Sequence, residues 1–145
     1  MVTPIIQDLR VQPLGAIPES GAVPDTEGFY YKAGETVKII DDRTVGKMDL
    51  TAGEVSIGIL QTSLSTTQRP GGLDARDRIA VLTRYNFLAR GVAEGPLTAG
   101  QYIVDGDTTA GTFRVYNSAG GDTPDMIRGV VWKGALDAAE FEYLM

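Results

Sequence analysis

The stretch AGETVKI at residues 33–39 decides the fold, because a close counterpart, AGQYIV, returns at residues 99–104. In both, an Ala-Gly turn leads into β-branched and apolar residues, a composition typical of a short strand opened by a turn. Working outward, two further pairs recur in the same order: IGIL at 57–60 with RGVV at 128–131, and IAVL at 79–82 with FEYL at 141–144. The chain therefore holds one β-unit twice, at about residues 33–90 and 99–145.

The two copies differ in the length of one connection. From Gly58 to Leu82 is 24 positions, whereas from Gly129 to Leu144 is 15. The difference of nine equals the length of the polar stretch STTQRPGGL at residues 65–73. We interpret this stretch as an insertion in the first copy.

Strand signals are dense from residue 29 onward. Short β-branched or aromatic runs bounded by Gly, Asp or Thr predict strands, and they lie at 36–40, 54–60, 102–105, 112–116, 127–132 and 140–144. Residues 78–90 alternate with period two, which predicts one long strand, or a strand bent near Asn86. We therefore expect an all-β fold: a small, pseudo-duplicated antiparallel β-barrel or β-tulip at residues 29–145, closed to hide its strand edges.

Residues 1–28 have a different character, with four prolines that disfavour helix and remove backbone donors. We expect an extended N-terminal arm here. Free linkers are normally polar, but this segment carries apolar residues, so we expect it to lie on its own barrel, a neighbouring subunit or another protein. The residues expected to make this contact are Ile5, Ile6, Leu9, Val11 and Leu14.

Composition excludes several classes of function. The 145-residue chain has no cysteine and no histidine, which removes disulfides, thiolate chemistry and the commonest side chain for proton transfer near neutral pH. A formal net charge of −6 opposes nucleic-acid binding, which depends on Lys and Arg neutralising phosphates. No apolar run approaches the roughly 20 residues that cross a bilayer, and MVTPIIQDLR does not read as a secretory signal.

The best metal candidate is the Asp-Gly-Asp sequence at residues 105–107. Calcium loops space acidic residues this closely, but no acidic residue follows at the distance that an EF-hand requires. The segment also lies between two predicted strands, where Asp and Gly are common turn residues. We favour a hairpin turn and predict no metal site.

Other potentially reactive groups have simpler interpretations. The pairs Asp41-Asp42 and Glu140/Glu142 could serve acid–base chemistry, but nothing in the sequence indicates the shifted pKa values that such a dyad needs. The serines lack a histidine base, and no phosphate-binding glycine motif is present. Trp132 fits a core or subunit interface, and Arg84 and Arg90 are either solvated or at subunit contacts. We predict no catalytic residues and no cofactor.

The repeated units, AGETVKI with the following IGI, then LTAGQY and RGVV, resemble small head proteins of tailed bacteriophages, the decoration or cement proteins of the capsid exterior. The resemblance covers residues 28–145. It implies a β-rich body, homotrimers at three-fold or quasi-three-fold sites, and the major capsid protein as partner. It also implies a virion location on the outer shell after synthesis in the host cytoplasm. The family has no catalytic residues to transfer.

The expected function is therefore a non-enzymatic structural protein that stabilises a phage capsid, with no nucleic-acid or membrane partner. An alternative is another virion component, such as a tail-tube, head–tail connector or fibre-base protein. A further alternative is an enzyme or sugar-binding module that uses acidic residues with a metal.

Overall fold

The computed structural model describes residues 5–49 and 54–145 and is almost entirely β-structure. The chain forms two compact units, residues 11–84 and residues 85–145 together with the N-terminal segment up to Arg10. Each unit contains a closed five-stranded barrel. The predicted all-β, pseudo-duplicated barrel is confirmed, and the repeated strands of each copy belong to a separate barrel.

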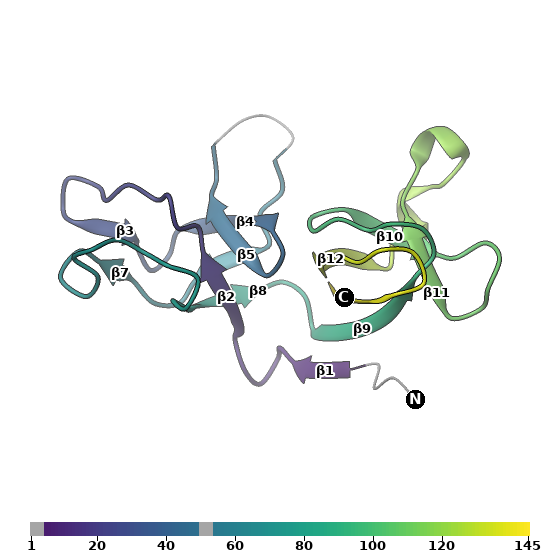
Figure 1. Ribbon diagram of the computed structural model, residues 1–145, viewed down its shortest axis with the longest axis horizontal. Helices are drawn as coiled ribbons and strands as arrows, with labels where there is room; N and C mark the ends of the chain where they lie inside the picture. The colour runs from purple at the N-terminus through teal and green to yellow at the C-terminus, as the bar shows by residue number, and fades with distance from the viewer. Residues whose placement is uncertain (1–4, 50–53) are drawn as a thin grey trace. The chain divides into compact units, whose positions relative to one another are not determined.

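The first barrel is built from residues 11–84 and has the strand order β2-β5-β4-β6-β8 (Figure 1). A two-stranded sheet, β3 with β7, belongs to the same unit. The strands are β2 (Leu14–Pro18), β3 (Phe29–Tyr31), β4 (Thr36–Asp41), β5 (Thr44–Lys47), β6 (Gly58–Leu60), β7 (Leu64–Ser65) and β8 (Ile79–Thr83). Four of the barrel pairings are antiparallel, and β2 with β5 is parallel.

The second barrel has the order β9-β11-β10-β12-β13 and closes through β9 with β13. Here β9 with β11 is the parallel pair. The elements of this unit are β1 (Ile5–Asp8), β9 (Phe87–Ala93), β10 (Tyr102–Asp105), β11 (Thr112–Val115), two 3₁₀ turns η1 (Ser118–Gly120) and η2 (Pro124–Met126), β12 (Gly129–Lys133) and β13 (Glu140–Leu144). The two 3₁₀ turns are the only helical elements of the described residues, and neither has the length needed to span a membrane.

The two barrels are equivalent strand by strand. The orders match when β2 corresponds to β9, β5 to β11, β4 to β10, β6 to β12 and β8 to β13. Registers agree as well: Ile59 faces Leu82 in the first barrel, and Val130 faces Leu144 in the second. The sequence repeat therefore reports three of five equivalent strands.

The repeated Ala-Gly turn has one geometry in both copies. Gly34 and Gly100 adopt φ of +93° and +91°, which a side chain would strain. Their amides donate to Leu60 O and Val131 O, both at 2.8 Å. This turn joins the start of one strand to its neighbour, which explains why the motif recurs.

Of the predicted arm, residues 1–28, the described part from Ile5 onward does not form a separate arm. Strand β1 pairs with β9, and β2 is a wall of the first barrel between β5 and β8. Leu14 at the start of β2 is 1% exposed and belongs to the core. Strands β1 and β2 are extended, as predicted, but both are sheet members: β2 is the fifth strand that closes the first barrel, and β1 adds an edge strand beside β9 of the second.

Two of the predicted strands differ in their bounds from the strands of the structure. Residues 78–90 divide into β8 and β9 at the boundary between the two units, near the predicted bend. The segment 54–60 is strand only at Gly58–Leu60. The proposed insertion, 65–73, lies in the connection from β6 to β8, which the second copy replaces with the shorter turn from β12 to β13.

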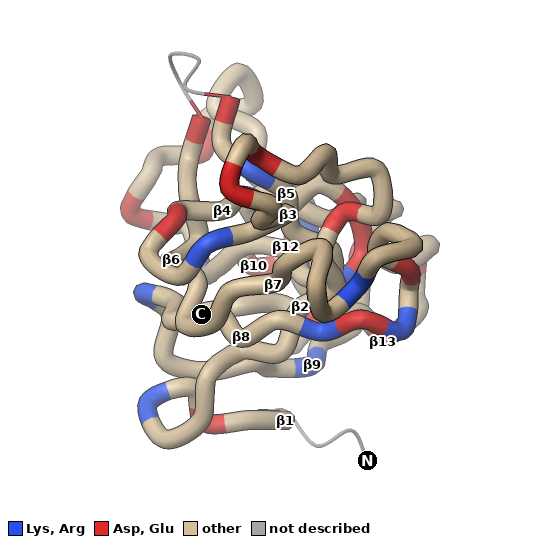
Figure 2. The backbone as a smooth tube through the Cα atoms, turned by 90° about the vertical axis from the view of Figure 1, so that its left-hand side faces the viewer, with Lys and Arg blue, Asp and Glu red and all other residues tan. Residues whose placement is uncertain are grey.

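Apolar side chains fill both barrels. In the first, Leu14, Val37, Val45, Leu60 and Val81 are at most 2% exposed. The second is centred on an aromatic group in which Phe113 meets Phe141 edge-on at 5.9 Å and Phe141 stacks on Tyr143 at 5.3 Å. Many acidic residues lie in the loops that connect the strands (Figure 2).

Candidate functional site

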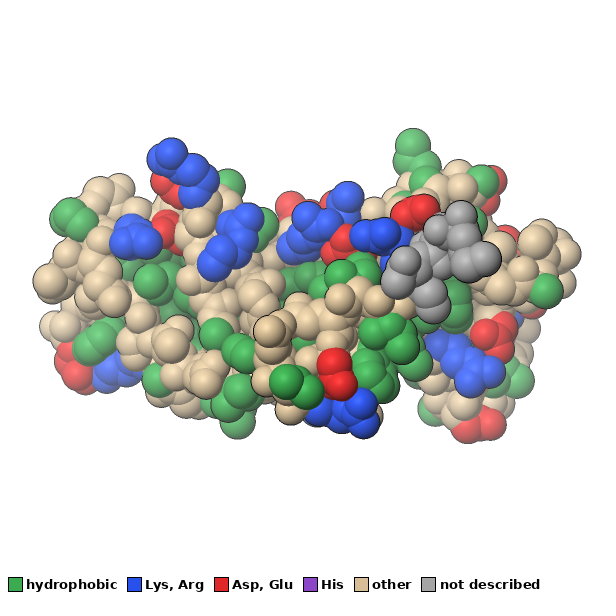
Figure 3. Space-filling model, turned by 90° about the horizontal axis from the view of Figure 1, so that it is seen from below, with side chains coloured by type: hydrophobic (Ala, Val, Ile, Leu, Met, Phe, Trp, Pro, Cys, Tyr) green, Lys and Arg blue, Asp and Glu red, His purple; other side chains and the backbone are tan. Residues whose placement is uncertain are grey.

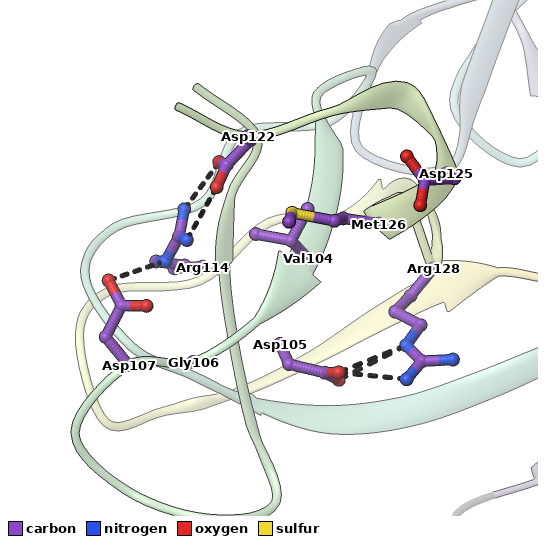
Figure 4. Close-up of a pocket in the computed structure, with 9 residues that line it drawn as sticks. All are labelled: Val104, Asp105, Gly106, Asp107, Arg114, Asp122, Asp125, Met126 and Arg128. Atoms are coloured by element: carbon purple, nitrogen blue, oxygen red, sulfur yellow. Dashed lines mark hydrogen bonds and ion pairs between the residues drawn. The ribbon is translucent and has the colours of Figure 1, made fainter. Parts of the chain in front are cut away.

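The Asp-Gly-Asp sequence borders a cavity of about 510 Å³ in the second unit (Figure 4). Asp105 ends β10, Arg114 lies on β11, and Asp125 lies on η2. The cavity is lined by Val104, Asp105, Gly106, Asp107, Arg114, Asp122, Asp125, Met126 and Arg128. Six of these nine residues are charged, so the cavity bears on the metal and acid–base alternatives.

The two arginines of this cavity are held by its own carboxylates. Arg114 donates from both terminal nitrogens to Asp122, at 2.7 and 2.8 Å, and its Nε lies 2.8 Å from an oxygen of Asp107. Arg128 lies 2.9 Å from Asp105. The hydrogen bond from Arg114 lowers the pKa of Asp122 to about 2. A carboxyl group with a lowered pKa stays ionised at neutral pH and is unsuited to act as a general acid.

The loop after Asp105 is built around an internal anion. The backbone amides of Asp107 and Thr108 donate to the Glu94 carboxylate at 2.7 and 2.9 Å, and the Thr108 hydroxyl donates to it at 2.6 Å. These donors lower the pKa of Glu94 to about 2, with the hydroxyl as the largest cause. Converging N–H groups favour an anion, whereas Ca²⁺ needs converging oxygen atoms. The segment is the hairpin loop between β10 and β11 that was predicted.

Within residues 5–49 and 54–145, no three acidic, histidine or cysteine side chains are grouped so as to hold a metal ion. Asp41 ends β4 and Asp42 follows it in the turn to β5. Glu140 pairs with Arg90 at 3.5 Å. Glu142 is 8% exposed, whereas Glu140 at the start of the same strand is exposed.

The predicted contact residues of the N-terminal arm are divided between surface and core. Ile5 and Ile6 on β1 are 48% and 41% exposed, and Val11 is 80% exposed. Leu9 is half-buried, and its amide donates to Asn86 O at 2.8 Å. Leu14 is a core residue, so its prediction as a contact residue of the arm is wrong. Among the described residues, β1 pairs with β9 alone, so its other edge stays open.

The predicted interface residues are likewise divided. Trp132 on β12 is 1% exposed, so it is a core residue rather than a subunit contact. Its large apolar ring is accommodated because β12 is buried on both faces from Gly129 to Trp132. Arg90 is half-buried beside Glu140, and Arg84 is exposed next to β8.

Sequence reasoning missed an apolar hollow on the first barrel. Its volume is about 420 Å³, and it is lined by Thr36, Ser56, Ile57, Gly58, Ile59, Leu82, Thr83 and Arg84. Ile59 and Leu82 face each other across β6 and β8 and are 46% and 52% exposed. Leu82 alternates with the buried Val81 on β8, and an apolar residue on the outward face of this strand was the signal that could have identified the hollow.

Exposed apolar side chains therefore accompany well-paired charges on this molecule. Figure 3 shows hydrophobic atoms at the surface among basic and acidic groups of both signs. No protein-family model matches the chain, and a search of curated proteins finds no significantly similar sequence.

Proposed function

We propose that this chain is a non-enzymatic structural protein of a tailed phage that binds the outer surface of the capsid, as a homotrimer, and stabilises the shell. The observation that carries the proposal is the combination of two rigid, apolar-filled barrels with large apolar side chains left at the surface. The resemblance of the repeated β-units to decoration proteins supplies the identity of the partner, the major capsid protein.

The charged groups support an adhesive role over a catalytic one. In the polar cavity of the second unit, each arginine is paired with a carboxylate, and the pKa of Asp122 is lowered rather than raised. General acids near neutral pH need raised carboxyl pKa values. Such charges stabilise loops and shape a surface for docking.

Strand β1 is the surface that we assign to the capsid. Ile5 and Ile6 are neighbours on this strand, where its register with β9 shifts, and both are more than 40% exposed. Burying apolar surface contributes about 25 cal/mol per Å², and an open strand edge offers backbone donors and acceptors as well. In an oligomer, the binding of one copy would hold the other copies near the capsid at a high effective concentration, so several weak contacts would together give tight binding.

The test uses expanded, undecorated capsids of the phage that carries the gene. Purified protein is mixed with them, pelleted through a sucrose cushion and imaged by cryo-electron microscopy. We expect saturable binding and new density on the outer shell. Protein that stays in the supernatant at all concentrations would refute the proposal, and tubes or rings in the purified material would favour a tail-tube or connector protein.

A variant pair locates the contact. Deleting the whole predicted arm is unsuitable because Leu14 is a core residue, so the substitutions Ile5→Asp and Ile6→Asp are made together. We expect them to reduce capsid binding at least tenfold. Val23→Asp is the control, since Val23 is also apolar and 78% exposed but lies outside β1. Equal binding by both variants would show that β1 is not the contact.

A further inference from the structure

The apolar hollow on the first barrel is lined by two large, exposed apolar side chains. Ile59 and Leu82 are cross-strand neighbours on the outward face of β6 and β8, and together they leave a wide apolar surface exposed. Gly58, next to Ile59 on β6, also lines the hollow. Arg84 lies at its border and gives that border a positive charge.

The internal repeat shows what happens to this face in the other copy. Val130 and Leu144 occupy the positions equivalent to Ile59 and Leu82, with the same cross-strand pairing. They are 4% and 0% exposed, whereas Ile59 and Leu82 are 46% and 52% exposed. One repeat therefore buries this pair within the folded chain, and the other leaves the equivalent pair at the surface.

The turn between β12 and β13 has the properties of a matching partner. Leu136 at this turn is 79% exposed, although leucine is usually buried. The turn is held in place by the amide of Gly95, which donates to Asp137 at 2.7 Å, and by the bridge between Leu97 and Ala135. Leu136 is thus presented on a fixed support.

Charge complements this apolar match. Asp137 follows Leu136 directly and places an acidic side chain beside the leucine, whereas Glu140, at the start of β13, is paired with Arg90. The hollow is bordered by a cation, Arg84. Opposite charges around an apolar contact favour one orientation of docking and oppose the self-pairing of two hollows.

We propose that Leu136 of one copy inserts into the hollow formed by Ile59 and Leu82 of a second copy. The contact is head-to-tail, because the two surfaces are different parts of the chain, and such contacts form closed rings or open chains. This inference rests on the self-association in the proposed function and specifies its surfaces. It does not depend on the capsid contact.

Cysteine pairing provides the test, because the natural chain contains no cysteine and therefore no background. Leu82→Cys and Leu136→Cys proteins are purified separately, mixed, oxidised mildly and analysed on non-reducing gels. We expect disulfide-linked dimers in the mixture, at least fivefold more than in either protein alone. A chain carrying both substitutions should give trimers or a longer ladder.

The control replaces Leu136→Cys with Val23→Cys, which is equally exposed but lies on another surface. Cross-linking of the Leu82→Cys protein with this control at an equal yield would overturn the proposal, as would the absence of cross-linking in the main mixture. Dimers formed by Leu82→Cys alone would show hollow-to-hollow pairing and would also overturn it. Capsid binding is measured separately, so protein that cross-links as expected but ignores capsids refutes only the proposed function.

Discussion

Replacing Gly129 with alanine should destabilise the second barrel, for a reason visible in both copies of the repeat. A Cβ atom at Gly129 would lie 2.2 Å from the carbonyl oxygen of Leu144, on the neighbouring strand β13. Ordinary contacts begin at 3.4 Å. Because the obstructing atom belongs to the backbone, β12 and β13 must separate by about 1 Å or twist locally.

The expected magnitude follows from two opposing effects. Overpacking of this kind costs about 1–3 kcal/mol, and a stretched strand pair also weakens hydrogen bonds worth about 0.5–1.5 kcal/mol each. Alanine also lowers the conformational entropy of the unfolded chain, which stabilises the folded state by about 0.4–1 kcal/mol. We therefore expect Gly129→Ala to lower the free energy of unfolding by about 1–3 kcal/mol.

Urea titration followed by Trp132 fluorescence measures this effect, because Trp132 is the only tryptophan and lies on β12 itself. Gly15→Ala is the matched control, since nothing lies within 4 Å of its Cβ. The equivalent change Gly58→Ala, with a Cβ 2.4 Å from Leu82 O, should destabilise the first barrel similarly. A Gly129→Ala protein within about 0.5 kcal/mol of the wild type would refute the steric explanation.

Three further predictions concern the core and two titrating groups. Phe141→Ala should cost about 3–5 kcal/mol in a urea titration, because Phe141 is 1% exposed and contacts two other rings; a loss below 1 kcal/mol would contradict this. Burial raises the pKa of Tyr31 to about 12, so the folded state holds this proton more tightly than the unfolded state. The free energy of unfolding should therefore fall between pH 10 and 12, and that of the Tyr31→Phe protein should fall less over the same range. An equal pH dependence in the two proteins would argue against burial of Tyr31 as the cause. Glu94 has its pKa lowered from 4.5 to about 2, so its contribution is present above pH 4.5 and is lost as the pH falls toward 2. Glu94→Gln should reduce the loss of stability at low pH. It should also speed amide hydrogen exchange at Thr108, measured by NMR; unchanged exchange would show that Glu94 does not hold this amide.

Local patterns were sufficient to predict the strands that carry the repeat. The Ala-Gly turns at Gly34 and Gly100 demand a positive φ, which leaves a sequence signature, and the strands that follow alternate with period two. Gly58 and Gly129 also recur because a carbonyl of the neighbouring strand occupies the space of a side chain. Requirements of this local kind can be recognised from sequence.

The equivalence of the fifth strands of the two barrels, β2 and β9, could not be predicted in the same way. Strands β2 and β9 are equivalent in position, but Leu14-Gly15-Ala16 shares no residue with Ala89-Arg90-Gly91 at matching positions. The prolines at residues 13 and 18 also indicated an irregular arm. Membership of β2 depends on pairing with β8, far along the chain, which no short window of sequence reveals.

The solvent exposure of the candidate surfaces could not be predicted from the sequence either. The alternation of β8 places Leu82 opposite Val81, but it cannot show whether the outer side is covered. Leu144, in the equivalent position, is fully buried. Trp132 illustrates the reverse case, since a large aromatic residue is compatible with both core and interface until its surroundings are known.

The path of the chain through the two units has a consequence for synthesis on the ribosome. Residues 11–84 are contiguous, so the first barrel can close as soon as they have emerged. Strand β1 emerges earlier still, but its partner β9 is translated only after the first barrel, so Ile5 lacks its pairing residue Ala89 until then. During that interval the nascent N-terminus presents Ile5 and Ile6 without their sheet, and such an unpaired apolar segment is prone to aggregation. The order of translation thus leaves β1 without its partner strand while the first barrel closes, and β1 joins a sheet only after β9 has emerged.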